Sequence, residues 1–205
     1  MILVNNSLSV VLIGDWNKLY IQPDWMAEHV YERSEIEIGV NGQGADFSIS
    51  YRCDDVIIVP EQSNVIFSAT DIGVETMDNM ARCINNFLEK AYTPSLFAYG
   101  INCDFIDEDA SVFADMLDGM SDSSLIIDNG YEIVSTKVSR TLLRNEKIMN
   151  METNIENAKV KMHFNEHYGE PDENPNFSVE RLQEFVNECI ELVRGLGYEM
   201  EGEDL

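Results

Sequence analysis

The feature that most constrains the fold is an alternation of apolar and polar residues that recurs in several segments. In residues 96–105, LFAYGINCDF, every second residue from Phe97 to Phe105 is apolar. Successive side chains of a β-strand point to opposite faces of a sheet, so this pattern predicts a strand with one buried face. Similar patterns or short β-branched runs predict further strands at 9–14, 35–40, 46–51, 56–60, 65–69, 131–143, 147–155 and 158–164.

Two long segments follow the helical period instead. Residues 74–91 and the segment that begins at Ser178 carry apolar residues at steps of three and four. Ser178 is a favourable N-cap, and Gly195 can end the second helix. The sequence therefore predicts an α+β protein. Shorter elements are also predicted: a helix after Pro23, a helix over 109–118, and a hairpin over 125–134 that turns at Asn129 and Gly130.

The order of these elements repeats along the chain. Each half reads strand, short helix, four strands and long helix, and the apolar residues of the two long helices correspond at a constant offset. We therefore predict two fused β-α-β4-α halves that form one pseudo-symmetric unit. The first half spans 1–93, the second spans 94–198, and an acidic tail follows at 199–205.

This order, β-α-β-β-β-β-α given twice, resembles the arrangement of the TATA-box-binding protein fold. The resemblance is one of topology and covers residues 8–197. It implies one curved antiparallel sheet with both long helices on its convex face. It does not imply DNA binding, because function depends on the site rather than on the fold. A saddle that binds DNA needs basic residues and apolar wedges on its concave face.

The net charge limits the classes of partner. The chain has 38 acidic and 13 basic residues, which give a formal charge of −25. Such a field repels nucleic-acid phosphates and anionic membranes and attracts basic proteins, so we expect no direct DNA binding and no membrane association. No basic residue precedes the first apolar run, and no apolar run approaches the ~20 residues that cross a bilayer, so we expect neither a signal peptide nor a membrane span. The four cysteines form no CxxC pair, which favours reduced thiols and a cytoplasmic location.

One short motif suggests enzymatic chemistry. Residues 163–167, HFNEH, match the H-x-x-E-H pattern of the inverted zinc peptidases. That chemistry needs His163 and His167 on one face of a helix, with Glu166 activating a water molecule. The residues from Ala158 onward alternate instead, which predicts a strand with His163 on its polar face and His167 in the loop beyond. Because four residues of a strand span about 13 Å, we expect no metal and no cofactor at this motif.

Charge segregation is the stronger functional signal. No lysine or arginine occurs from Ala91 to Thr136, and six basic residues fall within the next 25 positions. Surfaces of opposite charge allow self-association into a homo-oligomer or the docking of a charged partner. The residues we predict to bind a partner are Lys137, Arg140, Arg144, Lys159, Lys161, His163, Asp107, Glu108 and Asp109.

The sequence contains no complete catalytic constellation, which favours a non-catalytic protein. We expect an acidic cytoplasmic interaction module that inhibits or escorts a basic, nucleic-acid-binding protein. Two alternatives stay open. The first is a metal-dependent hydrolase that uses the HFNEH segment. The second is a small-anion or nucleotide-binding module on the strand face that carries Lys159 and Lys161.

Overall fold

The fold is that of a computed structural model. The structure describes the chain except residues 17–20, 44–45, 92–95, 111–127, 131, 158, 170, 172–174 and 202–205. Much of the predicted helix over 109–118 and of the predicted hairpin over 125–134 therefore lies outside the described residues.

The chain forms one open, antiparallel sheet of ten strands, in the order β3-β4-β5-β6-β2-β7-β10-β9-β8, with β1 beside β7. The predicted α+β class is therefore confirmed. The strands are β1 (Ile2–Leu3), β2 (Ser9–Gly14), β3 (Glu37–Gln43), β4 (Asp46–Cys53), β5 (Val56–Pro60), β6 (Asn64–Ala69), β7 (Leu96–Asp107), β8 (Ser135–Arg144), β9 (Lys147–Glu156) and β10 (Lys159–Gly169).

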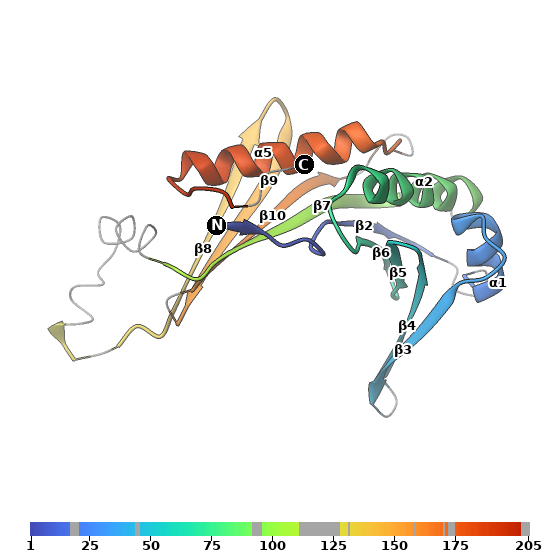
Figure 1. The fold of residues 1–205 in the computed structure, drawn as a ribbon, viewed down its shortest axis with the longest axis horizontal. Coiled ribbons are helices and arrows are strands. Elements are labelled where there is room, and N and C mark those ends of the chain that lie inside the picture. The colour runs from blue at the N-terminus through green and yellow to red at the C-terminus, as the bar shows by residue number, and fades with distance from the viewer. Residues whose placement is uncertain are drawn as a thin grey trace.

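The helices lie on one face of this sheet (Figure 1). A short helix, α1 (Pro23–Trp25), starts at the proline and continues as a π-helical segment, η1 (Met26–Tyr31). The two long helices are α2 (Val74–Lys90) and α5 (Val179–Gly195). Ser178 caps α5 as predicted, because its hydroxyl accepts a hydrogen bond from the Arg181 backbone N–H at 3.3 Å. No helix in the described part of the chain is long and apolar enough to cross a membrane.

The centre of the sheet is the antiparallel pair of β2 and β7. The meander from β3 to β6 extends the sheet on one side, and β10, β9 and β8 extend it on the other. β2 precedes the predicted boundary between residues 93 and 94, and β7 follows it. Because these two strands pair with each other, both predicted halves belong to the same sheet. The described residues form one continuous arch (Figure 1) and do not establish two duplicated halves. The duplication stays a prediction.

The two largest differences from the predicted strand boundaries are in β8 and β10. The strand predicted to begin at residue 131 begins at Ser135. The strand predicted to end at residue 164 continues to Gly169, so the predicted loop at His167 is wrong. The reason is pairing on both sides, since His167 lies opposite Gly100 of β7 and Ile148 of β9. A strand flanked by two partners gains a second row of backbone hydrogen bonds, and this outweighs the weak strand preference of the local residues.

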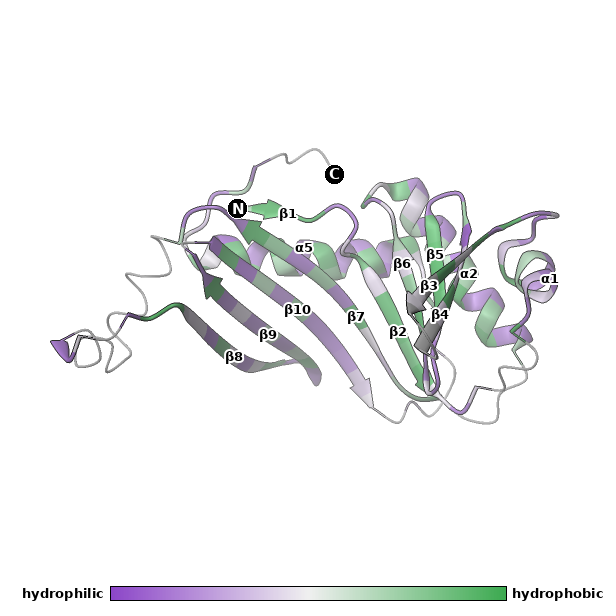
Figure 2. Ribbon diagram, turned by 90° about the horizontal axis from the view of Figure 1, so that it is seen from below, coloured by the Kyte–Doolittle hydropathy of each residue, from purple (hydrophilic) through white to green (hydrophobic). Residues whose placement is uncertain are grey.

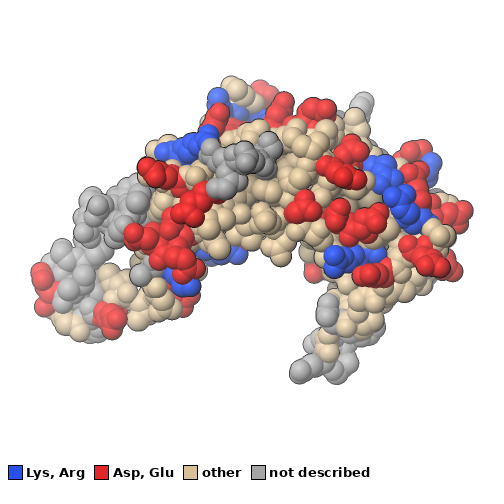
Figure 3. All heavy atoms as spheres, viewed as in Figure 1, with Lys and Arg blue, Asp and Glu red and all other residues tan. Residues whose placement is uncertain are grey.

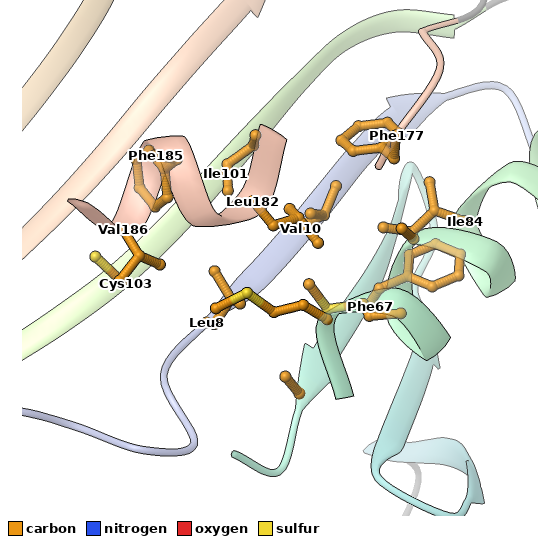
Figure 4. Packing of buried hydrophobic residues seen from close by; sticks show 14 of the residues in the cluster. Leu8, Val10, Phe67, Ile84, Ile101, Cys103, Phe177, Leu182, Phe185 and Val186 are labelled. Atoms are coloured by element: carbon orange, nitrogen blue, oxygen red, sulfur yellow. The ribbon is translucent and has the colours of Figure 1, made fainter. Parts of the chain in front are cut away.

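The core lies between the sheet and the two long helices (Figure 4). Val10 of β2 and Ile101 of β7 are register partners at the centre of the sheet, and both are fully buried. Leu182 of α5 and Ile84 of α2 are also fully buried in this cluster. Three of the four cysteines, Cys83, Cys103 and Cys189, are free thiols within the same layer.

The packing of α5 on the sheet gives a first testable prediction. Replacing Leu182 with alanine should lower the free energy of unfolding by about 2–5 kcal/mol, because a fully buried leucine leaves a cavity under the helix. The change can be measured by urea unfolding followed by circular dichroism. Leu143→Ala is the matched control, since Leu143 is 76% exposed, and should change stability by less than about 0.5 kcal/mol. Equal effects of the two substitutions would contradict this position of α5.

Candidate functional site on the open face of the sheet

The face of the sheet opposite the helices, here called the open face, carries four of the nine predicted site residues. Along β10, Val160, Met162 and Phe164 are buried under the helices, so the residues between them point to the other side. Figure 2 views the sheet from below, where α2 and α5 lie behind the strands. The arch leaves a hollow on this side of the molecule (Figure 3).

The structure brings part of the predicted set together and separates the rest. Lys137, Lys159, Lys161 and His163 all lie on the open face, on β8 and β10. Asp107 ends β7 on the helix side of the sheet, as the register partner of the buried Val160, and forms an ion pair with the amino group of Met1 at 3.0 Å. Glu108 and Asp109 follow directly and are exposed.

Three predicted residues lie on the helix side instead: Asp107 of β7 and two arginines of β8. Arg140 is the register partner of the buried Met151, which places it on the helix side of β8. Arg144 ends β8 and forms an ion pair with Glu188 of α5 at 3.4 Å. The period-two pattern of β8 separates Arg140 from Lys137, so these two residues do not share a surface with each other.

The lysines of the open face are paired with acids. Lys161 Nζ lies 2.8 Å from Asp104 Oδ2, and His163 Nδ1 lies 2.7 Å from Asp104 Oδ1. The two remaining pairs are Lys159 with Glu108 at 2.6 Å and Lys137 with Glu152 at 2.7 Å. The predicted basic strand face is therefore a network of opposite charges. Asp104 and Glu152, absent from the predicted set, provide two of its three carboxylates.

Asp104 is the centre of this network. Burial opposes ionisation of its carboxyl group, but hydrogen bonds from His163 and Lys161, together with the charges of both partners, outweigh that effect and lower its pKa. The carboxylate is thus held ionised between two donors from β10. Its register partner His163 also lies opposite Glu152, so the imidazole lies between two acidic residues.

A row of amide side chains crosses the sheet beside the charged network. Asn165 of β10 donates to Asn102 Oδ1 of β7 at 2.8 Å and accepts from Asn150 Nδ2 of β9 at 3.3 Å. Thr141 of β8 completes the row by donating to Asn150 Oδ1 at 2.9 Å. Each of these four residues is a register partner of the next. The amide row therefore connects four strands on the open face.

The next row along the strands is largely aliphatic. It crosses six strands, each residue opposite the next: Ile66, Val11, Gly100, His167, Ile148 and Leu143. Ile148 is 38% exposed and Leu143 is 76% exposed. Gly100 makes room for the amide row, because a Cβ atom there would lie 2.6 Å from Asn165 Nδ2. The open face thus passes from charged to amide to aliphatic side chains.

The HFNEH segment does not form a metal centre. His163 and His167 lie on the open face of β10, at a strand separation of about 13 Å. Glu166 lies on the opposite face, where its side chain is buried and its Oε1 contacts Lys147 Nζ at 3.2 Å and the Tyr168 hydroxyl. The three residues cannot surround one ion. Across the described residues, no group of three or more histidine, cysteine or acidic side chains is arranged to hold a metal.

Glu166 belongs instead to a network under the start of α5 that the sequence did not reveal. Tyr168 stacks on Tyr99 with the ring centroids 4.5 Å apart. The guanidinium of Arg181 lies 5.1 Å from the Tyr168 ring centroid and donates to the Tyr99 hydroxyl at 2.7 Å. Burial, and then the hydrogen bond to Glu166, raise the pKa of Tyr168. The network attaches α5 to β7 and β10.

No family model matches the chain, and no curated protein matches it by sequence.

The Asp104 network predicts a specific pH dependence. Because folding lowers the pKa of Asp104, its carboxylate stabilises the fold above the ordinary carboxyl pKa of about 4, and that contribution is lost as the pH falls through the lower folded value. Asp104→Asn should therefore cost about 1–2 kcal/mol at neutral pH and flatten the loss of stability on acidification. Urea unfolding between pH 7 and pH 3 measures both effects. An unchanged pH profile would contradict them.

The buried carboxylate gives a separate prediction. Glu166→Ala should lower the free energy of unfolding by about 1.5–3 kcal/mol, because it removes a charged hydrogen-bond partner of Tyr168 and Lys147. His167→Ala, at the next residue on the open face, should change stability by less than about 0.5 kcal/mol. Thermal unfolding of the two variants measures the difference. A larger effect at His167 would show that this part of β10 faces the other way.

Proposed function

We propose that the protein is a non-catalytic interaction module that binds a basic protein partner with the open face of its sheet. The observation that carries this proposal is the combination of a charged network, an amide row and an aliphatic row on one hollowed surface. No helix of the described residues covers that surface. An interface typically has an apolar centre with a polar rim, and these rows supply both.

The choice of a basic partner depends on charge. Lys137, Lys159 and Lys161 of the open face are each paired with an acid, so these lysines add no excess positive charge to a chain whose formal charge is −25. An acidic protein attracts basic proteins and accelerates their association, and salt weakens that attraction. A nucleic-acid-binding protein presents such a basic surface, and an acidic module that occupies it would act as an inhibitor or an escort. We also propose that the protein is located in the cytoplasm, as expected from the sequence.

The two alternative functions receive less support from the geometry. A small anion or nucleotide at Lys159 and Lys161 would have to displace Glu108 and Asp104 from ion pairs of 2.6 Å and 2.8 Å. A metal-dependent hydrolase would need both histidines of HFNEH and Glu166 around one site, whereas His163 and His167 are about 13 Å apart along the strand and Glu166 is buried on its other face.

The internal duplication, with its resemblance to the TATA-box-binding protein fold, also stays a proposal. The strand order supports it, because β2 and β7 lie at the centre and the strands that precede each long helix, β6 and β10, flank that pair. Most of the predicted helix over 109–118 and part of the predicted hairpin over 125–134, which would complete the second half, lie outside the described residues.

The proposed function can be tested by affinity capture with matched variants. The immobilised chain should retain basic proteins from its native extract at physiological salt and release them at 0.5 M salt, because salt screens the attraction (Debye length about 8 Å at 0.15 M). Mass spectrometry would identify the partner, and calorimetry would then give its affinity. Ile148→Lys, on the aliphatic row, should weaken the affinity at least about tenfold, as expected for a charge placed in an interface.

Val74→Lys is the control, because Val74 is 55% exposed on α2, on the other side of the sheet. It should leave the affinity unchanged. If both substitutions had the same effect, the attraction would be general to the acidic surface and the open face would not be the site. Retention of no basic protein would overturn the proposed function.

A further inference from the structure

The two edges of the sheet differ in how they are protected. An edge strand exposes unpaired backbone groups, and natural proteins prevent unwanted pairing there with charged residues, above all lysine. The edge strand β8 carries three basic residues, Lys137, Arg140 and Arg144. The other edge strand, β3, reads EIGVNGQ, and its one charged residue is Glu37, at the start. By this criterion β8 is protected against pairing and β3 is not.

Two of the exposed side chains of β3 are aliphatic. Ile38 is 51% exposed and Val40 is 68% exposed. Both lie on the same side of the strand, since Ile38 is opposite Tyr51 and Val40 is opposite Ile49 on β4. Within the described part of the chain, β3 pairs with β4 alone. The hairpin of β3 and β4 extends away from the body of the protein (Figure 1), which makes its outer edge accessible.

We propose that β3 pairs with β3 of a second copy of this chain, antiparallel about a twofold axis at Gly39. In this register Ile38 of each copy lies opposite Val40 of the other, which forms two aliphatic cross-strand pairs. Glu37 lies opposite an uncharged residue, Asn41, so no like charges meet. Within its own chain Glu37 is already opposite Arg52 of β4. The edge is therefore complementary to itself, which is the requirement for a twofold interface.

A second copy suits this edge better than a basic partner does. The strand offers backbone hydrogen bonds and aliphatic side chains, with little charge for a cationic group to recognise. The projecting hairpins also keep the two acidic bodies apart, which reduces repulsion between charges of −25 each. Added salt screens the remaining repulsion, so the dimer should become tighter as salt rises. The proposed complex with a basic protein should show the opposite salt dependence.

Sedimentation of the full chain over a range of concentrations tests the proposal. The unmodified protein should form a dimer whose dissociation constant decreases at higher salt. Val40→Lys should shift it to monomer, with at least a tenfold weaker association, because it places a charge on the shared edge. Leu143→Lys is the matched control at the other edge, since Leu143 is 76% exposed on β8, and it should stay dimeric.

A charge-pair experiment fixes the register. Val40→Lys and Ile38→Glu should each be monomeric alone, and an equimolar mixture should form a heterodimer, because the introduced lysine then faces the introduced glutamate while the other pair stays aliphatic. Circular dichroism should show that each variant is folded. A monomeric unmodified chain at all concentrations, a dimer insensitive to Val40→Lys, or a mixture that stays monomeric would overturn the proposal. These results do not depend on whether the open face binds a basic protein.

Discussion

The architecture depends on the antiparallel pairing of β2 with β7. These two strands are distant in sequence, and their pairing joins the meander of β3 to β6 with β10, β9 and β8 in one sheet. Val10 and Ile101, partners in this pair, are fully buried under the helices. Both long helices cover one side of a continuous sheet, and no helix of the described residues covers the opposite side. The position of the helices therefore determines which face of each strand is accessible to another molecule.

The register of the same sheet determines what the open face contains. A shift of one residue along β10 would exchange His163 and Asn165 for Met162 and Phe164. In the observed register, His163 faces Asp104 and Asn165 faces Asn102. Strand pairing thereby aligns residues that are far apart in the sequence into rows of charged, amide and aliphatic side chains. The open face is a product of long-range pairing, and none of its rows exists within a single strand.

The site could be predicted only in part. The alternation in residues 158–164 correctly placed Lys159, Lys161 and His163 on one face, because the side-chain period of a strand is a local property. Asp104, which pairs with Lys161 and His163, and Glu152, which lies opposite His163, were not predicted, since they come from other strands and meet β10 only through its register. For the same reason the sequence suggested a free basic face, whereas the fold has a network of ion pairs. The buried position of Glu166 follows from the same alternation, extended two residues further.

The sequence by itself determined the α+β class, the positions of the long helices, most of the strands and the strongly acidic character of the protein. These properties depend on side-chain periodicity and composition, which act within a few residues or over the whole chain. The tertiary structure alone decided the strand order, the extent of β10 to Gly169 and the partners of each charged residue. Backbone hydrogen bonds between distant strands control these features, and a local pattern contains no information about which strand lies alongside.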